Sequence, residues 1–505
     1  MRGWLGCQLR MAVGSEINVK GERDMLGGYW RKIAVVDLTT EKIDYFVPSE
    51  EDLKKFIGAS GLGAKLLYEN LEAGVDPLSP ENIMICMTGP YVGAKVPQSG
   101  RWELITKSPL TGIYLESDCG GKWGPALKSC GLDGIMVKGK AREPVYITIV
   151  DDDIRIKKAD HLWGKGAFET DRLIKEELGR GSQAICIGQA GESLVKLASI
   201  MSDGREGRAA GRGGGGAVMG SKNLKAIGVM GSKKMPIANQ EAFDKLFDEI
   251  RAKTKDVHEG PLGTYGTSCA VEIFNDCGDL PIKNWLWGTW DKARMVSGQR
   301  LAETVLKKRY HCSSCLIGCG RTVEVPGGKF KMELGGGPEY ETLGMLGSNC
   351  LIDDVEAISK ANEYCNDYGM DTISVLSPLA RGDIRDQGVL CDVRSPRSVR
   401  MPLPLDARTL FDVHLRARVV RVRQDLLPVR IRKHAGRLQH SARPPDSAGC
   451  LRVSGADAEE PVLRDDVASR HDSFFRRSGK RLGAIRGPPR DVRAPVGRVS
   501  GGREE

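Results

Sequence analysis

The balance between lysine and arginine reverses after Ser374, and this reversal limits how much of the chain can share one folded core. Residues 1–374 hold 31 Lys and 17 Arg, whereas residues 375–505 hold 2 Lys and 25 Arg and contain neither Trp nor Tyr. The second region also has no helical or strand period, so nothing in it predicts a packed core. We therefore expect a disordered tail over residues 375–505. A frameshift in a GC-rich gene would explain the reversal, and a natural basic tail is the alternative.

Hydrophobic periodicity predicts a β-rich region in the first half of the remaining chain. Alternating apolar and polar residues predict β-hairpins over residues 32–47 and 145–156. Short apolar runs that end in turn residues predict buried strands at 83–87 and 184–188. A helix is predicted between them, over residues 167–178.

The period changes near residues 232–236. From residue 239 onward, apolar residues recur three or four positions apart, which predicts amphipathic helices. The positions are Ala242, Leu246, Phe247, Ile250, Leu301, Val305, Leu306, Val355, Ile358 and Ala361. The sequence thus predicts an α+β fold, with a β-rich domain over residues 25–233 and a mainly α-helical domain over residues 234–374.

Three of the 14 cysteines, Cys312, Cys315 and Cys319, crowd into eight residues, while the others are scattered singly. Three thiolates this close together can hold three irons of a cubane cluster. A zinc site more often pairs two separated halves, and no second half follows at the usual distance, so zinc and unliganded thiols are the weaker alternatives. Cysteines without a disulfide framework suit a reducing compartment, which predicts a cytoplasmic location.

A glycine-rich basic segment, residues 207–222, predicts a binding site for a phosphorylated cofactor. Its sequence is GRAAGRGGGGAVMGSK. Glycines such as Gly211 let the backbone approach a ligand closely, backbone amides can bind phosphate oxygens, and the arginines add charge-assisted contacts. The apolar segments on both sides argue against a flexible linker. Arg101 and the Asp118–Gly121 segment, with its close-approach Gly120, combine the same groups, although alone they would be ordinary loops.

The net charge of +9 comes from the tail and gives no argument for nucleic acid as a partner. Residues 1–374 hold 48 basic and 50 acidic side chains, a balance of −2, whereas residues 375–505 hold 27 and 16, a balance of +11. Recognition of nucleic acid would need basic groups on the folded part. No run of about 18 uncharged apolar residues occurs, so no membrane-spanning helix is predicted.

The order and the amino-acid sequences of several segments between Met25 and Ser374 resemble those of the aldehyde:ferredoxin oxidoreductase family. The matching segments are the cysteine segment and residues 27–39, 75–82, 106–112, 208–227, 337–341 and 371–374. The resemblance implies a tungsten or molybdenum ion held by two pterins, a [4Fe-4S] cluster and a magnesium ion that bridges the pterin phosphates. It also implies that translation starts at Met25 and that residues 1–24 are a non-native extension.

The resemblance assigns roles to four residues of the β-rich domain, which would form a base beneath the bis-pterin. Arg101 would bind the pterin system. Arg208 and the carbonyl of Ala209 would lie near the phosphates and their magnesium. Asp118 stands where the family commonly has Asn as a magnesium contact, and a carboxylate can still ligate this hard cation.

Three residues of the helical domain also receive roles from the resemblance. Asn366 and Asp371 begin and end a segment similar to the family's pterin-binding Asp-x-x-Gly-Leu-Asp, with Asn in place of the first Asp. Glu341 aligns with the acidic residue beside the metal. Its carboxylate would move a proton or hydrogen-bond the substrate during catalysis.

The activity that this resemblance implies is oxidation of a small aldehyde to a carboxylic acid, with electrons passed through the cluster to ferredoxin. A homodimer is left open. Alternatives within the superfamily are an aromatic acyl-CoA reductase subunit and a sugar-phosphate aldehyde oxidoreductase. A non-catalytic iron-sulfur electron carrier is the alternative of another class, but it leaves the glycine-rich segment unexplained.

The tail departs from the family pattern. In the family, the fourth cluster cysteine, a second acidic pterin motif and a histidine beside the metal lie in a third domain. None is recognisable after Ser374, and Cys391 and Cys450 lack the family context. We therefore expect the 505-residue chain to bind little cofactor and to have impaired activity.

Overall fold

The structure is a computed structural model that describes residues 26–94 and 96–375. The predictions for residues 1–24 and, apart from Val375, for the tail lie outside the described residues. No helix among the described residues is long and apolar enough to cross a membrane.

The first sheet has six strands in the order β2-β1-β6-β3-β4-β5, and only β1 and β6 run parallel. Its strands are β1 (Ile33–Asp37), β2 (Lys42–Phe46), β3 (Met84–Thr88), β4 (Trp102–Lys107), β5 (Tyr114–Cys119) and β6 (Gly134–Lys138). Asp37 shapes the β1–β2 turn, because its Oδ1 accepts hydrogen bonds from the backbone N–H groups of Thr39 and Thr40, at 2.9 and 3.2 Å. The predicted hairpin over 32–47 and the strand at 83–87 are confirmed.

The second sheet also has six strands, in the order β11-β10-β9-β12-β7-β8. Its strands are β7 (Val145–Val150), β8 (Asp153–Lys158), β9 (Gln183–Cys186), β10 (Ile200–Ser202), β11 (Arg208–Ala210) and β12 (Leu224–Met230). The hairpin over 145–156 and the strand at 184–188 are confirmed, as is the helix over 167–178.

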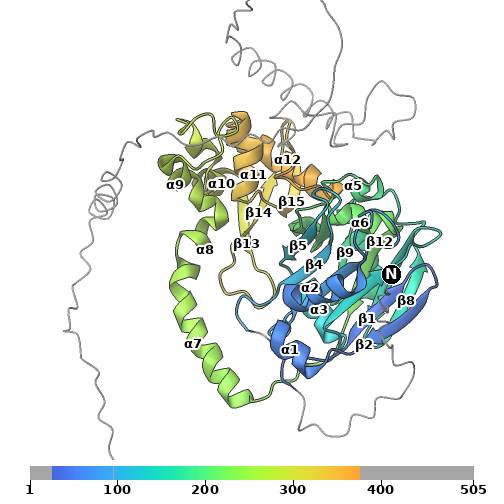
Figure 1. The fold of residues 1–505 in the computed structure, drawn as a ribbon. Helices are drawn as coiled ribbons and strands as arrows, with labels where there is room; N and C mark the ends of the chain where they lie inside the picture. Colours follow the sequence, from blue (N-terminus) through green and yellow to red (C-terminus); the bar gives the residue numbers. More distant parts are fainter. Residues whose placement is uncertain (1–25, 95, 376–505) are drawn as a thin grey trace, which may run out of the picture. The chain divides into compact units, whose positions relative to one another are not determined.

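The core of this part lies between the two sheets, where the helix α3 (Trp123–Ser129) packs against strands of both (Figure 1). The rings of Trp102 and Trp123 meet edge to face at 4.9 Å, and Trp123 Nε1 donates to the carbonyl of Ile227 at 3.1 Å. Apolar residues of α2 (Ala59–Asn70) cover the outer face of the first sheet, and α4 (Ala167–Leu178) covers that of the second. This layered packing holds the edge strands β5 and β11 in place near the site.

The remaining helices are α1 (Glu50–Phe56), α5 (Gln189–Glu192), α6 (Gly215–Ser221), α7 (Gln240–Glu259), α8 (Pro261–Tyr265), α9 (Ala270–Cys277), α10 (Gly298–Thr304), α11 (Tyr340–Thr342) and α12 (Val355–Tyr368). Apolar residues of α5, α6, α9, α10 and α12 form a second core, whereas Leu53 of α1 packs with α2 on the first sheet. The α7 helix begins at Asn239, whose side chain accepts from Ala242 N at 2.9 Å. Its apolar face is less enclosed than the periodicity suggests, since none of its residues is buried and Leu246 is 55% exposed.

The α+β class is confirmed, and the helical part contains one sheet that the sequence interpretation did not include. This antiparallel sheet is formed by β13 (Leu306–Tyr310), β14 (Gly320–Val325) and β15 (Met332–Gly336). Leu306, assigned to a helix by its spacing, begins β13 instead. The proposed domain boundary near residue 234 stays a prediction.

Candidate functional site

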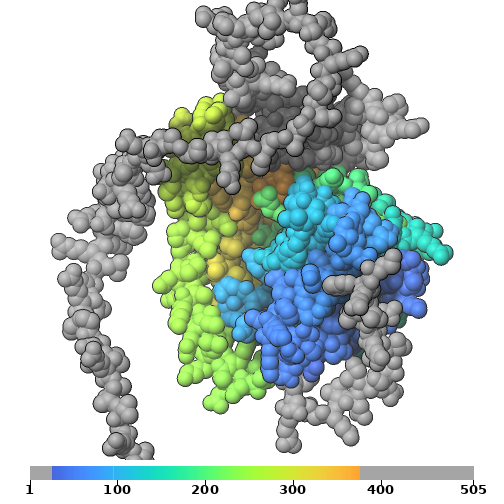
Figure 2. All heavy atoms as spheres, viewed as in Figure 1, coloured from blue at the N-terminus to red at the C-terminus, as the bar shows by residue number. Residues whose placement is uncertain are grey.

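The three clustered cysteines lie on the loop between β13 and β14, which folds back against the N-terminal half of the chain. Within the loop, Cys315 N donates to the carbonyl of Cys312 at 3.1 Å. Ser313 N donates to the carbonyl of Gly121 at 2.9 Å, and Gln98 N donates to the carbonyl of Ser314 at 3.3 Å. Figure 2 shows the yellow atoms of this region beside the blue atoms of the N-terminal half.

Two glycines of the N-terminal half make room for this loop. A Cβ atom at Gly120 would lie 2.8 Å from Cys312 Sγ, and one at Gly100 would lie 2.6 Å from the carbonyl oxygen of Ser313. Both distances are shorter than van der Waals contact, so any side chain there would displace the cysteine loop. Gly120 therefore lets the Cys312 thiol approach the backbone. Arg101 directly follows Gly100, which contacts Ser313.

The three thiols are farther apart than the ligands of one zinc ion would be. Around one zinc ion, tetrahedral sulfur ligands at about 2.3 Å would lie about 3.8 Å apart. Among the described residues, Cys312, Cys315 and Cys319 do not form a group with ligand atoms all within 4.8 Å of one another. The irons of a cubane spread their thiolates farther apart. Burial raises the pKa values of Cys312 and Cys319, and the nearby Arg208 guanidinium opposes both rises.

Arg208 joins the two halves of the chain beside these thiols. Its Nη1 forms an ion pair with Glu339 Oε1 at 3.0 Å, and its guanidinium lies 5.2 Å from the centre of the Tyr310 ring. Burial lowers the pKa of Arg208, but Glu339 and Cys312 raise it by more, so the group stays charged. Its Nε is buried with no hydrogen-bond partner in the described part of the chain. A donor of this kind fits an anionic ligand such as a pterin phosphate.

The rest of the 207–212 segment meets the predicted pterin motif of the helical half. Arg212 Nε lies 3.6 Å from Asp371 Oδ2, and the buried Asp371 also accepts hydrogen bonds from Ile373 N and Ser374 Oγ. A Cβ at Gly207 would lie 2.6 Å from Asn366 Nδ2. The two predicted ends of the pterin motif are thus brought against the glycine-rich segment.

The later glycines of the segment pack against other parts of the protein backbone. This differs from the prediction that the whole segment binds a ligand. A Cβ at Gly216 would lie 2.5 Å from the Ser199 carbonyl oxygen, and one at Gly220 would lie 2.0 Å from that of Gly191. By contrast, the nearest atom to a Cβ at Gly211 is Ala209 Cβ, at 3.9 Å. Within the described residues, Gly211 is thus the glycine of this segment that leaves space beside its backbone.

Lys222, the last residue of the segment, is a structural group. Its side chain is fully buried, and Nζ donates to the backbone carbonyls of Pro80, Asn82 and Gly139. Burial lowers its pKa to about 8. Since all its donors point at the protein backbone, Lys222 is not available to a phosphate.

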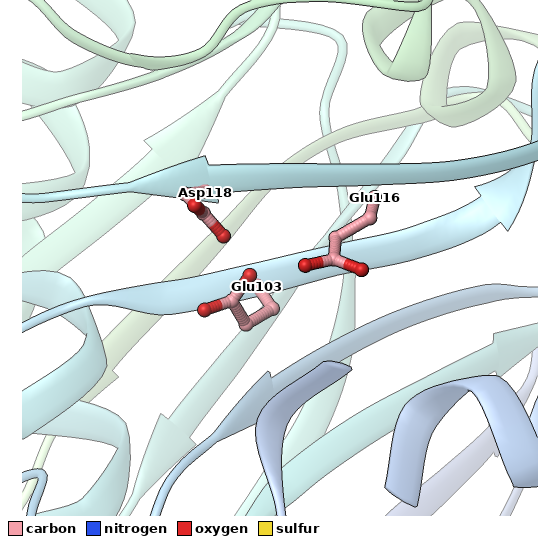
Figure 3. A group of neighbouring side chains, drawn as sticks. All are labelled: Glu103, Glu116 and Asp118. Atoms are coloured by element: carbon pink, nitrogen blue, oxygen red, sulfur yellow. The ribbon is translucent and has the colours of Figure 1, made fainter. Parts of the chain in front are cut away.

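Asp118 belongs to a group of three carboxylates on the face of β4 and β5. Figure 3 shows Glu103, Glu116 and Asp118 turned toward one another, and one oxygen from each lies within 4.8 Å of the others. Glu103 pairs with Asp118 across the strands. Burial, then the hydrogen bond and charge of Asp118, raise the pKa of Glu103 to about 8. The raised pKa of Glu103 favours its protonated form, which lowers the negative charge of this carboxylate group.

Glu341 makes no hydrogen bond or ion pair with this centre in the described part of the chain. It is exposed on α11 and has no hydrogen bond or ion pair within the described residues. Its neighbour Glu339 instead binds Arg208 and accepts from Thr267 Oγ1. The sequence interpretation missed Glu339, although it stands in the same matching segment, because nothing in the spacing distinguishes the two carboxylates. It also missed the buried Asp203 and the Tyr310 hydroxyl that donates to it, since 107 residues separate the two in sequence.

A pocket of about 660 Å³ opens beside the cysteine loop. It lies between α7 and the loop and is lined by Asp248, Arg251, Ala252, Thr254, Lys255, His258, His311, Cys315 and Leu316. Cys315 is the one clustered cysteine that faces it. The pocket therefore gives solvent or a partner access to one side of the thiol centre.

Two family models match the chain. Residues 33–231 match the model described as aldehyde ferredoxin oxidoreductase, N-terminal domain. Residues 244–381 match the model described as aldehyde ferredoxin oxidoreductase, domains 2 and 3.

Individual relatives agree with these models. The chain is 44% identical over 371 residues to the tungsten-containing aldehyde ferredoxin oxidoreductase of Pyrococcus furiosus, covering 71% of this chain and 60% of the relative. It is 42% identical over 369 residues to the protein of the same name from Thermococcus kodakarensis, covering 72% and 60%. The chain thus spans about 60% of the length of these curated relatives.

A solved structure shares the fold. It is the active-site complex BamBC of benzoyl coenzyme A reductase with 1,5-dienoyl-CoA, with a TM-score of 0.64 and 28% identity. The match covers 78% of this chain and 61% of that chain. Its lower identity makes it a more distant relative than the two aldehyde ferredoxin oxidoreductases.

Proposed function

Because the chain belongs to the aldehyde ferredoxin oxidoreductase family of oxidoreductase enzymes, we propose that its described residues hold the redox centres of an aldehyde-oxidising enzyme. The proposed reaction converts an aldehyde and water into a carboxylic acid, two protons and two electrons. The observation that carries the proposal is the convergence of Cys312, Gly120 and Arg208, which places a thiol centre beside an unsatisfied cationic donor.

The residues suit two neighbouring centres. Cys312, Cys315 and Cys319 would hold three irons of a [4Fe-4S] cluster. Arg208, Ala209 and Gly211 would face the pterin phosphates and their magnesium, with Asp118 as a further magnesium ligand. When bound, tungsten-pterin supplies two-electron redox chemistry and the cluster supplies single-electron transfer.

The pterin system would be held from both halves of the chain. We place Arg101 on the side of the first sheet, and Asn366 with Asp371 on the helical side. The ion pair of Arg212 with Asp371 supports this arrangement, because it already joins the two proposed binding segments. The domain division at residues 25–233 and 234–374 is part of the same proposal.

Glu341 is proposed to handle the proton of the reaction. Its exposed carboxylate has no ion-pair partner among the described residues, so it can accept a proton or hydrogen-bond the substrate. Glu339 is less suited, because its oxygens are engaged by Arg208 and Thr267. Its charge holds the Arg208 guanidinium in place instead.

The proposed electron acceptor is a ferredoxin or similar carrier, and the proposed substrate is a small aldehyde. Formation of a homodimer stays a prediction. Reduction of an aromatic acyl-CoA is a weaker alternative. It draws on the benzoyl coenzyme A reductase complex at 28% identity, whereas the aldehyde enzyme from P. furiosus is 44% identical.

The experiment that tests this function joins residues 1–375 of this chain to the remaining part of the P. furiosus relative. The chimera is purified without oxygen, and its tungsten, iron and pterin are measured together with aldehyde-dependent reduction of benzyl viologen. We expect metal, pterin and activity, with iron lowered by Cys312→Ser. A folded chimera that contains neither iron nor pterin would contradict the proposal.

We further propose that the 505-residue chain itself is impaired, because its residues after Ser374 lack the family's remaining ligand motifs. Purified in the same way, it should contain well under one tungsten and four irons per chain. A full complement of both would refute this part of the proposal and leave the proposed reaction standing.

A further inference from the structure

The carboxylate of Asp203 occupies the junction between the cysteine loop and the N-terminal half. Asp203 lies between β10 and β11 and is 9% exposed. Its Oδ1 accepts a hydrogen bond from Lys122 N at 3.1 Å, and its Oδ2 accepts one from the Tyr310 hydroxyl. One side chain therefore ties together the β10–β11 turn, the loop after β5 and the end of β13.

Each of these partners contacts the proposed redox site. The loop after β5 contains Gly120, which packs against Cys312 Sγ, and Gly121, whose carbonyl accepts from Ser313 N. Tyr310 stands two residues before Cys312, and its ring lies beneath the Arg208 guanidinium at 5.2 Å. The contacts of Asp203 thus surround Cys312 on one side and support Arg208 on the other.

The backbone conformation at Asp203 favours glycine, so the turn itself does not require a carboxylate. Asp203 has a φ of 62°, a conformation that glycine would adopt at lower cost. Gly121 has a φ of 92°, and a Cβ on it would lie 2.6 Å from Asp203 Oδ2. Burial disfavours the charged form of the Asp203 carboxylate. Its two hydrogen bonds offset part of this cost.

We propose that Asp203 is a positioning residue that fixes Cys312 relative to Arg208 by holding the Gly120–Lys122 loop and Tyr310 together. This inference rests on the proposed function, since Cys312 would face the cluster and Arg208 the pterin phosphates. The positioning of Cys312 by Asp203, however, is a property of the chain alone and can be tested without any bound cofactor.

The test measures how fast iodoacetamide alkylates Cys312 in the metal-free full-length chain, with mass spectrometry and Cys315 as the internal reference. Asp203→Ala removes both hydrogen bonds, so local opening should become easier and Cys312 should react about tenfold faster. Tyr310→Phe keeps the ring and removes one hydrogen bond, and it should give a smaller acceleration. If Asp203→Ala fails to fold, Tyr310→Phe still decides the question.

Removal of a negative charge near a thiol also favours the reactive thiolate, so a charge control is needed. Asp203→Asn removes the charge but keeps an acceptor for Lys122 N, and it should accelerate Cys312 less than the alanine variant does. Equal acceleration by Ala and Asn with none from Tyr310→Phe would mean a charge effect and overturn the proposal. Unchanged reactivity in all three variants would overturn it as well.

Asp171→Asn is the matched control for general destabilisation. Asp171 is another buried carboxylate, paired with Lys175 at 2.9 Å and next to Gly204, and among the described residues it has no hydrogen bond or ion pair to the cysteine loop. It should leave the reactivity of Cys312 unchanged, and acceleration equal to that of Asp203→Ala would refute the inference. Iron content of the chimera that contains residues 1–375 is measured separately, so a failure of the proposed function is distinguishable from a failure of this one.

Discussion

At the scale of single residues, the structure separates side chains that the sequence alone presents as equivalent. Lys222 and Arg208 both stand in the glycine-rich segment, and either could bind phosphate. Lys222 Nζ donates to three backbone carbonyls, whereas Arg208 Nε is buried and has no hydrogen-bond partner in the described chain. Burial and hydrogen-bond partners therefore decide which cation is available to a ligand.

The Lys222→Met variant should lower the free energy of unfolding, because three buried carbonyl groups lose their donor. The expected cost is about 3 kcal/mol at pH 7. Burial holds the pKa of Lys222 at about 8 in the folded chain, below its unfolded value. Between pH 8 and about 10.5 the unfolded state binds more protons, so the wild-type advantage should grow with pH. Urea unfolding of both proteins across this range tests the sign, and a constant difference would contradict it.

The two carboxylates of α11 and its N-terminal flank should respond differently to substitution. Glu339→Gln removes the partner of Arg208, a partly buried charge, and should cost about 2 kcal/mol of stability. Glu341→Gln should leave the melting temperature unchanged, because its side chain is exposed and has no ion pair in the described residues. In the loaded chimera, Glu341→Gln should lower kcat while iron content stays constant. Unchanged kcat would remove Glu341 from the proposed mechanism.

At the scale of elements, the short helices α5 and α6 depend on direct contact between backbones. A Cβ at Gly220 would lie 2.0 Å from the Gly191 carbonyl oxygen, and α6 also packs against β10 and β12 of the second sheet. Gly220→Ala should therefore cost about 3 kcal/mol of unfolding free energy. Gly327→Ala is the control, because a Cβ there meets no atom within 4 Å. Thermal unfolding of both variants tests this, and equal melting temperatures would contradict the packing account.

The elements that the sequence predicted are those whose periodicity reports burial on one face. The hairpin β1–β2 and the helix α12 follow clear periods of two and of about 3.6 residues. The strand β13 was missed because its sequence LKKRY is dominated by cations and its first residue continues a helical spacing. Pairing with β14 outweighs that local signal.

The site was predictable where its residues form a local motif, as the cysteine segment does. The partners that position this motif lie far away in sequence. Asp203 and Tyr310 are 107 residues apart, and no composition or spacing links them. Glu339 could have been chosen together with Glu341, but only tertiary contact shows which of them meets Arg208.

At the scale of the whole molecule, the cysteine loop joins the helical half to the first sheet. The loop belongs to the third sheet, yet its backbone bonds reach Gln98 and Gly121 in the N-terminal half. Arg205 adds a second connection through its ion pair with Glu363 on α12. A cluster bound by the loop would therefore stabilise both halves together, because ligands that bind only the folded state raise its stability.

Anaerobic reconstitution with iron and sulfide should accordingly raise the melting temperature of the chimera that contains residues 1–375 as one cooperative transition. Calorimetry with and without reconstitution measures this, and Cys315→Ser should show a smaller increase because one ligand is missing. Cys277→Ser is the control, since Cys277 is an exposed cysteine outside the loop. Two transitions, of which only one moves with iron, would mean that the loop contacts do not couple the halves. The same shift in wild type and Cys315→Ser would mean that the iron is bound elsewhere.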